Sequence, residues 1–375
     1  MKKIFGIMLA LLVLLPFNIC ALELAPNASS VIVLEPTTGE IIYERNSHER
    51  RHPASMTKIM TMLLVMEAID KGIISWEDMV TVSSNASSMG GSQILLETGE
   101  EMSVYDMFKG LSVASGNDAA VALAEKIAGT EEMFVKMMND RAKELGLQDT
   151  NFKNSHGLDE ANHYSTAYDM AMIAKELSKH EKVFEFTSIY EDYLRKGTDR
   201  SFWLVNKLVR FYKGVDGLKT GYTSEAGFCL TATANINGMR IIAVVMGEPD
   251  SDTRNKEVSS IFDYVYAQYG LNKVIDTNTV VKEVAVEKGK QEYVGVVPKE
   301  DVTDLYNKND GIGEFTYDIK VDNIKAPISK GDVVGQLTLM ENNNVIKTID
   351  LTVNDNVEKA NIFELYLRYL KQVFN

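Results

Sequence analysis

The stretch "GVDGLKTGYTSEAGFCLTATANINGMRIIAVVMGE" (residues 214–248) contains three runs that predict adjacent β-strands, at residues 214–223, 227–236 and 239–248. Asn237 and Gly238 separate the last two runs, and this dipeptide is the strongest short signal for a two-residue hairpin turn. We therefore expect an antiparallel sheet to be built around this segment.

The rest of the first 270 residues supplies an edge and a helical covering for that sheet. Residues 29–46, "SSVIVLEPTTGEIIYERN", predict two strands around a Thr-Gly turn. Apolar residues at helical spacing predict helices at 54–72, 103–115, 117–129, 130–146, 165–180 and 256–270. A strand pair, a long helical middle and then more strands predict an α/β (α+β) fold, with an antiparallel sheet flanked by helices. Strands 29–46 would join the late hairpin at the sheet edge.

The texture changes after residue 273. Short alternating runs separated by Gly, Asn and Asp predict a small all-β domain, a β-sandwich, over residues 274–356. The segment 357–375 ends in an amphipathic helix, because apolar and polar residues of 361–375 separate onto opposite sides of a helical wheel. Such a helix either packs on its own protein or lies in a membrane interface, and its aromatic residues and mildly basic polar side favour the membrane.

The first 21 residues predict a secretory signal peptide. Lys2 and Lys3 precede a short apolar run that ends at the small residue Ala21. A lipoprotein cut at Cys20 is disfavoured, because bulky Ile19 occupies a position that needs a small residue. The expected mature protein is exported, and its first domain covers residues 22–273. The net charge of −14 becomes −16 without Lys2 and Lys3, which argues against a nucleic-acid partner.

A serine and a lysine stand three residues apart near the start of the helix predicted at 54–72. Ser55 and Lys58 would share one face of this helix. A serine hydroxyl needs a base to become a good nucleophile, and lysine is a base only when it is neutral. Burial and a second cation would both lower its pKa. Taken by itself, the pair is better explained as an N-cap serine beside a solvated lysine.

Two further short motifs follow. "SGN" at 115–117 falls between two predicted helices, although "SSN" at 83–85 is a competing match in a Ser- and Gly-rich loop. "KTG" at 219–221 falls inside a predicted strand, where Lys219 would supply the second cation. Thr220 would hydrogen-bond a substrate carboxylate, and Gly221 would let a ligand backbone lie against the strand edge. Either motif alone also fits an ordinary helix cap or strand end.

The ordered set of three motifs resembles the penicillin-recognising serine enzymes. Within them the chain resembles the D-alanyl-D-alanine carboxypeptidases, the low-molecular-mass penicillin-binding proteins, over nearly the whole mature chain. This resemblance implies a β-lactamase/transpeptidase-like fold and a serine-type hydrolase that removes the terminal D-alanine from peptidoglycan stem peptides. It implies that Ser55 is the acylated nucleophile, that Lys58 is its general base and that Ser115 relays a proton.

The resemblance also assigns the residues that hold the substrate. Asn117 would hold the substrate's amide, and Lys219 and Thr220 would bind its terminal carboxylate. The backbone N–H groups of Ser55 and Tyr222 would form the oxyanion hole. The implied partners are stem peptides, β-lactam antibiotics as covalent inhibitors, and a membrane surface at the outer face of the bacterial cytoplasmic membrane. No cofactor is implied.

Two alternatives share parts of this pattern. A class A-like β-lactamase would need a glutamate that activates the deacylating water, and Glu160 is the only nearby candidate, in a loop that does not match. Gly116 stands where many β-lactamases carry Asp, and Tyr222 stands where some carboxypeptidases carry His. A non-catalytic penicillin-sensing or peptidoglycan-binding protein would not need the complete catalytic set. Metal hydrolysis is disfavoured, because the five histidines show no metal-ligand spacing.

Overall fold

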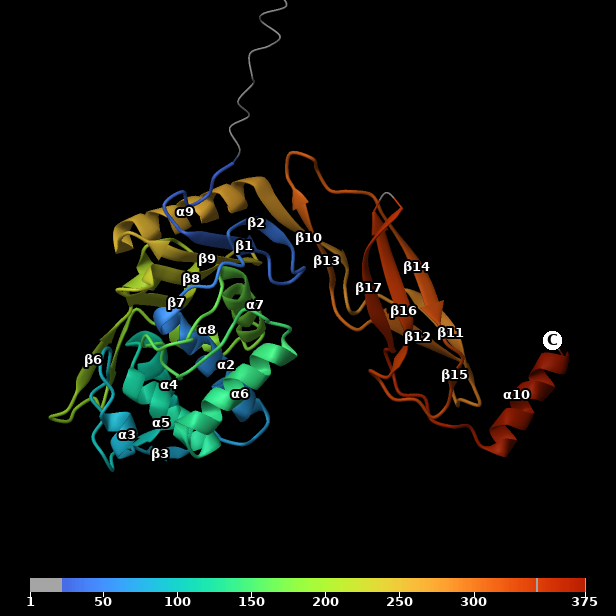
Figure 1. The fold of residues 1–375 in the computed structure, drawn as a ribbon. Helices are drawn as coiled ribbons and strands as arrows, with labels where there is room; N and C mark the ends of the chain where they lie inside the picture. Colours follow the sequence, from blue (N-terminus) through green and yellow to red (C-terminus); the bar gives the residue numbers. More distant parts are fainter. Residues whose placement is uncertain (1–21, 342, 375) are drawn as a thin grey trace, which may run out of the picture.

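The computed structural model describes residues 22–341 and 343–374, with side chains described as far as Leu370. The expected signal peptide at residues 1–21 lies outside the described residues. Figure 1 shows a larger α/β domain, a separate all-β domain and a C-terminal helix at the far end. The predicted fold class is confirmed.

A five-stranded antiparallel sheet in the order β2-β1-β9-β8-β7 forms the centre of the first domain. Its strands are β1 (Ser30–Leu34), β2 (Ile41–Arg45), β7 (Val215–Thr223), β8 (Gly227–Ile236) and β9 (Met239–Glu248). The three strands predicted at 214–248 are confirmed, and β1 and β2 join them at the edge beyond β9, as expected. β7 lies at the opposite edge, so one side of this strand is free of sheet partners.

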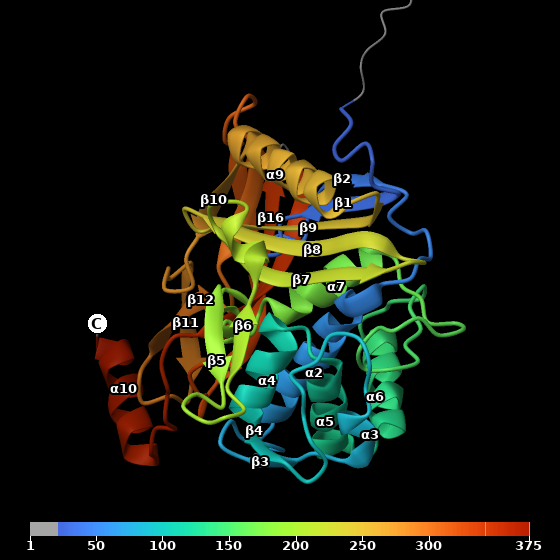
Figure 2. The same cartoon turned by 90° about the vertical axis from the view of Figure 1, so that its left-hand side faces the viewer.

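The sheet is buried on both faces because its side chains alternate between two cores. Ile242 and Val244 of β9 face the core that contains the helical region, whereas Ile241 and Val245 face the core that contains the long helix α9. In Figure 2, α9 covers one face of the sheet, and the helices of the helical region, among them α2, α4, α5, α6 and α7, lie on the opposite face.

The helical region is close to the sequence prediction. Its helical elements are η1 (Ala54–Thr57), α2 (Lys58–Asp70), α3 (Ser84–Ser87), α4 (Val104–Val113), α5 (Asn117–Ala128), α6 (Glu131–Glu144), α7 (Ala167–Leu177), α8 (Val183–Thr187) and η2 (Lys207–Arg210). The helix predicted at 54–72 begins as the 3₁₀ turn η1. Ser55 therefore lies in this turn, and Lys58 is the first residue of α2.

Helix α9 (Ser251–Gln268) differs from its prediction at both ends. It begins five residues earlier than residue 256, because the Asp250 side chain accepts hydrogen bonds from the N–H groups of Asp252 and Thr253 and caps the helix. It ends at Gln268, two residues before the expected end at Gly270, because strand β10 (Tyr269–Ile275) begins at the next residue. β10 crosses the expected domain boundary at 273/274 and pairs with β13 (Val302–Asn307).

Two small hairpins have no counterpart in the sequence prediction. They consist of β3 (Met79–Thr81) with β4 (Glu101–Ser103), and β5 (Glu191–Leu194) with β6 (Phe202–Val205). These strands are only three or four residues long, too short to show a period. The second hairpin is held by tertiary packing instead, because Leu194 and Leu204 are fully buried against the helical region.

The second domain is built from a six-stranded sheet in the order β14-β16-β17-β12-β11-β15. Its strands are β11 (Lys282–Glu287), β12 (Tyr293–Pro298), β14 (Phe315–Val321), β15 (Ile324–Lys325), β16 (Val333–Glu341) and β17 (Asn344–Val353). Val357 and Ala360 are also buried here, and Val357 is part of the domain's apolar core. The domain therefore extends to residue 360, four residues past the expected end at 356.

The chain closes with helix α10 (Ile362–Phe374). Among the described residues, no helix is both long enough and apolar enough to cross a membrane.

Candidate active site

Ser55 sits on a tightly packed turn between the sheet and the helical region. The preceding residue, Ala54, has a left-handed backbone with φ +48°. Gly157 lies directly against Ala54, and a Cβ at this glycine would collide with the Ala54 carbonyl. His163 fixes Thr57, two residues after Ser55. Its Nδ1 accepts a hydrogen bond from the Lys153 N–H, so Nε2 carries the proton and donates to Thr57 Oγ1 at 2.8 Å. The turn that presents Ser55 is therefore held from two sides.

The Lys58 amine is fully buried and has three neighbours at hydrogen-bond distance. It donates to Asn117 Oδ1 and to the His156 carbonyl, each at 2.6 Å. The third neighbour is Ser55 Oγ at 3.1 Å. A neutral amine has two hydrogens and one lone pair. The two carbonyl oxygens use both hydrogens, so the lone pair is left for the serine hydroxyl, which is the arrangement that a general base requires.

The surroundings of Lys58 favour the neutral amine. Burial lowers the pKa of Lys58 well below its ordinary value, and the positive charge of Lys219 lowers it further. The Asp118 carboxylate opposes this shift from farther away. Burial is the larger cause, so the second cation that the sequence predicted contributes less than desolvation does.

Asn117 and Asp118 tie the second motif to the loop at residues 90–96. Asn117 Nδ2 donates to the Gly90 carbonyl at 2.7 Å, and its backbone N–H donates to the Ser92 carbonyl. The buried Asp118 carboxylate accepts from the N–H groups of Ile94 and Leu96. One N–H of the Asn117 amide remains free of these contacts and is available for a substrate carbonyl.

Ser115 stands out by its backbone and its hydroxyl. It is a non-glycine residue in the left-handed region, with φ +61°. Its Oγ is buried and has no hydrogen-bond partner among the described residues. Such strain and such an orphan hydroxyl are typical of a functional position. Gly116 follows it, and a Cβ there would lie 2.9 Å from Asp118 Oδ1, so the buried Asp118 disfavours a larger residue.

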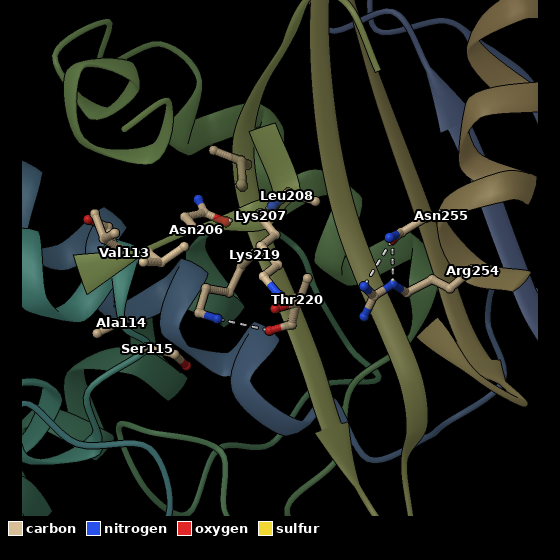
Figure 3. A pocket seen from close by; sticks show the side chains of 13 residues that line it. Val113, Ala114, Ser115, Asn206, Lys207, Leu208, Lys219, Thr220, Arg254 and Asn255 are labelled. Carbon is tan, nitrogen blue, oxygen red and sulfur yellow. Dashed lines mark hydrogen bonds between the residues drawn. The ribbon is translucent and has the colours of Figure 1, made fainter. Parts of the chain in front are cut away.

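Ser115, Lys219 and Thr220 line one cavity of about 380 Å³. In Figure 3 the Ser115 and Lys219 side chains approach this space from opposite sides. Arg254 and Asn255 of α9 also line it, and Asn255 Oδ1 accepts two hydrogen bonds from the Arg254 guanidinium. Lys207 lines it as well, so the cavity joins the unpartnered Ser115 hydroxyl to three basic side chains.

Arg254 acts on the ionisation of Lys219. Burial, and then the charge of Arg254, lower the pKa of Lys219 to about 7. Within the described part of the chain, the one hydrogen bond of Lys219 Nζ goes to the Thr220 carbonyl, at 3.0 Å. Because arginine keeps its proton at any physiological pH, Arg254 is a permanent cation of this cavity.

Gly221 and Tyr222 continue strand β7 beyond Lys219. A Cβ at Gly221 would lie 2.8 Å from the Pro53 carbonyl and 3.2 Å from Ala54 Cβ. The structure thus gives Gly221 a different reason from the one expected: it lets β7 pack against the turn that carries Ser55. Tyr222 is 57% exposed, and its ring packs on Phe228 of β8.

Three contributors to the site were absent from the sequence interpretation. Asp118 was adjacent to "SGN" and could have been found as a buried acid in an otherwise apolar helix. Arg254 gave no signal, because an arginine in an amphipathic helix is ordinarily a surface residue. His156 contributes through its backbone carbonyl, which no residue pattern can reveal. Its side chain is buried, and burial followed by the Lys58 charge lowers the pKa of His156 to about 4.

The geometry places a serine, a buried lysine and a basic cavity at the junction of the two halves of the first domain. Residues 20–250 match the D-alanyl-D-alanine carboxypeptidase family, and residues 269–359 match the penicillin-binding protein 5 C-terminal domain. The chain is 50% identical to the D-alanyl-D-alanine carboxypeptidase DacF of Bacillus subtilis, over 93% of this chain and 90% of that protein. The chain belongs to the D-alanyl-D-alanine carboxypeptidase family.

Solved structures agree with this membership. Penicillin-binding protein 5 from Haemophilus influenzae superposes with a TM-score of 0.72 at 31% identity, covering 90% of this chain and 99% of that one. Penicillin-binding protein D2 from Listeria monocytogenes, solved with cefotaxime bound, has a TM-score of 0.57 at 32% identity, covering 64% and 97%. The resemblance inferred from the three motifs is confirmed. The class A-like β-lactamase is not favoured, and Glu160 is exposed.

Proposed function

We propose that this protein is a serine-type D-Ala-D-Ala carboxypeptidase that removes the terminal D-alanine of peptidoglycan stem peptides through an acyl-enzyme on Ser55. The single observation that carries the proposal is the Lys58 amine, buried at 3.1 Å from Ser55 Oγ with both of its hydrogens used by carbonyl oxygens. In the neutral form, which burial and the Lys219 charge favour by lowering the pKa of Lys58, this amine has only a lone pair to offer the serine.

Acylation begins when Ser55 Oγ attacks the carbonyl carbon of the scissile peptide bond and its proton passes to Lys58 Nζ. The backbone N–H groups of Ser55 and Tyr222 stabilise the oxyanion of the tetrahedral intermediate. When the C–N bond breaks, the proton that Lys58 received passes through Ser115 to the leaving nitrogen, which leaves Lys58 neutral again; the Ser115 hydroxyl has no other partner among the described residues. D-Alanine departs and an ester on Ser55 remains.

The cavity beside Ser115 supplies the selectivity for a chain end. A terminal carboxylate would meet Lys219, Thr220 and Arg254, which all line this cavity. A bidentate guanidinium and a hydroxyl suit a carboxylate better than they suit an internal peptide bond. Asn117 would offer its remaining N–H to the amide of the acyl part.

Deacylation repeats the proton transfer with water. Water attacks the ester carbonyl, its proton passes to Lys58, and Ser55 leaves with a proton returned from that amine. A β-lactam enters by the same acylation, but its leaving nitrogen stays tethered within the adduct. We expect it to block the site for longer than a peptide does.

Mass spectrometry of the mature protein after penicillin exposure tests the proposal. We expect one adduct of the penicillin's mass on the peptide that contains Ser55, together with D-alanine release from a D-Ala-D-Ala peptide. An adduct at another residue would move the nucleophile. An adduct without any D-alanine release would instead favour a penicillin sensor.

We also propose that the protein is exported and lies peripherally on the outer face of the cytoplasmic membrane, where it takes part in cell-wall biogenesis and in maintaining cell shape. The signal-like residues 1–21 support export. In α10 most of the described apolar and aromatic side chains are exposed, with Ile362 87% and Phe363 68% exposed. The helix contacts its own protein through its polar side instead, because Arg368 donates to the Gly289 and Lys290 carbonyls and pairs with Glu292. An apolar face turned outward supports the membrane alternative for this helix.

A further inference from the structure

The loop at residues 90–96 holds Asn117, and both sides of this loop are fixed by hydrogen bonds. On the side of α5, Asp118 takes the N–H groups of Ile94 and Leu96. On the opposite side, two arginines take the carbonyls: Arg195 Nη1 donates to the Ile94 carbonyl at 3.0 Å, and Arg200 Nη2 donates to the Leu95 carbonyl at 2.8 Å.

Both arginines come from the turn of the β5–β6 hairpin and share one carboxylate. Arg195 Nε lies 2.5 Å from Glu100 Oε1, and Arg200 Nη1 lies 3.1 Å from Glu100 Oε2. The Arg195 and Glu100 side chains are only 11% and 13% exposed. Each arginine reaches a different oxygen of this partly buried carboxylate, and such a three-membered ion-pair network fixes geometry more firmly than an isolated surface ion pair does. We call Glu100, Arg195 and Arg200 the loop clamp.

Backbone strain concentrates at the same place. Leu95 and Arg195 are non-glycine residues in the left-handed region, with φ +58° and +50°. Such conformations are strained and persist only where the surroundings hold them. Both strained residues belong to the contact between the loop and the hairpin, so the protein maintains this contact at a cost in stability.

The loop clamp also connects the two walls of the active-site region. The turn of the hairpin holds the loop to which Asn117 is hydrogen-bonded, while the end of β6 at Val205 and the following Asn206 line the cavity with Lys219. The spacing between the Asn117 wall and the carboxylate-binding wall therefore depends on one rigid hairpin.

We propose that Glu100, Arg195 and Arg200 are positioning residues that set the place of Asn117 relative to the carboxylate-binding cavity, and thereby the affinity for the peptide. None of the three contacts Ser55, Lys58 or the Lys219 ammonium among the described hydrogen bonds and ion pairs. They act through the loop. This inference rests on the proposed D-Ala-D-Ala peptidase activity.

The test compares Arg195→Met with a matched variant elsewhere in the same domain. Arg141 also bridges two partly buried carboxylates, Glu67 at 2.8 Å and Glu176 at 3.0 Å, but these residues join α6 to α2 and α7 and belong to no part of the site. Steady-state kinetics on a D-Ala-D-Ala peptide and thermal melting are measured for the wild type, Arg195→Met and Arg141→Met.

For Arg195→Met we expect kcat/KM to fall about tenfold, mostly through KM, because misplacement of a binding group weakens substrate holding more than it changes the serine–lysine pair. Arg195→Met and Arg141→Met should lower Tm by similar amounts, but Arg141→Met should leave KM unchanged. Arg195→Lys should not restore KM, because a lysine cannot bridge Glu100 and the Ile94 carbonyl bidentately. Arg200 is the more exposed arginine of the loop clamp, so Arg200→Met should raise KM only about threefold. This variant replaces Arg195→Met in the test if Arg195→Met does not fold.

Equal KM values in Arg195→Met and Arg141→Met would overturn the inference, as would full recovery by Arg195→Lys. A wild type that binds penicillin but releases no D-alanine would defeat the proposed function instead, so the two failures are distinguishable.

Discussion

Lys58 Nζ and Ser55 Oγ lie 3.1 Å apart across a single helical turn. The short separation follows from their spacing in the sequence, but the direction of proton transfer does not. It follows from Asn117 Oδ1 and the His156 carbonyl, which are 59 and 98 residues away in the chain and occupy the two hydrogens of the amine. The nucleophile and its base are therefore local neighbours whose chemistry is set by distant residues.

Removing the nucleophile should abolish both activities of the site. We expect Ser55→Ala to lose D-alanine release and covalent penicillin labelling completely, because no oxygen remains to form the ester. Ser83→Ala is the control. It lies in the competing "SSN" and caps α3 through the Ala86 N–H, so it should lose about 1 kcal/mol of stability and keep full labelling. Labelling of the Ser55 variant at the wild-type rate would contradict the assignment.

The charge of Lys219 should appear in the pH profile. Its pKa of about 7 means that the free enzyme loses this cation as the pH rises through neutrality, so kcat/KM should fall on the alkaline side of about pH 7. Replacing Arg254 with Gln removes a neighbouring positive charge and should move this limb to higher pH, although kcat/KM itself falls. A limb that does not move between the two enzymes would show that another group titrates.

Glu248 should make stability depend on pH. Burial, followed by interaction with the nearby Glu257, raises the pKa of Glu248 from 4.5 to about 8, and both of its oxygens lack hydrogen-bond partners among the described residues. The unfolded chain releases this proton near pH 4.5 and the folded protein near pH 8, so stability falls as the pH rises between these values. The Glu248→Gln variant stays neutral at this position. At pH 8 its free energy of unfolding should exceed that of the wild type by roughly 2 kcal/mol, so it should unfold at a higher urea concentration.

Urea unfolding at pH 5 and pH 8 checks the Glu248 prediction. The two proteins should converge at pH 5 and separate at pH 8. Glu132 lies at an exposed position of α6. Glu132→Gln removes one surface charge and leaves Glu248 in place, so the free energy of unfolding should depend on pH as it does in the wild type. If Glu248→Gln shows the same loss between pH 5 and pH 8 as the wild type, the buried carboxyl is not the group responsible.

Deleting the terminal helix should separate membrane attachment from catalysis. The deletion should begin at residue 361, because Val357 and Ala360 are buried in the β-domain. We expect the shortened protein to stay in the supernatant when it is centrifuged with lipid vesicles, with unchanged kcat/KM on a soluble peptide. In the full chain, Phe363→Glu with Tyr366→Glu should have the same effect, since both side chains are exposed. Continued sedimentation of either variant would show that attachment lies elsewhere.

Residue order alone is enough to predict the elements whose physics is local. Alternating side chains and the Asn237–Gly238 turn were enough to predict β7, β8 and β9, and three motifs in the right order were enough to indicate the family. The same holds for the amphipathic pattern of α10, because the separation of its two faces depends only on residue order. These features need no knowledge of which distant segments come together.

Features that depend on burial and on long-range contact come from the folded chain instead. Desolvation of Lys58 needs the whole helical region packed around it, and Arg254 reaches the cavity only because α9 crosses the sheet. The short β5–β6 hairpin has no period of its own and owes its position to Leu194, Leu204 and the loop clamp. Gly221 is needed for contact with a turn more than 160 residues earlier in the chain. A pKa, a close approach and an ion pair are properties of neighbours in space, and the order of residues along a chain does not state which neighbours folding will supply.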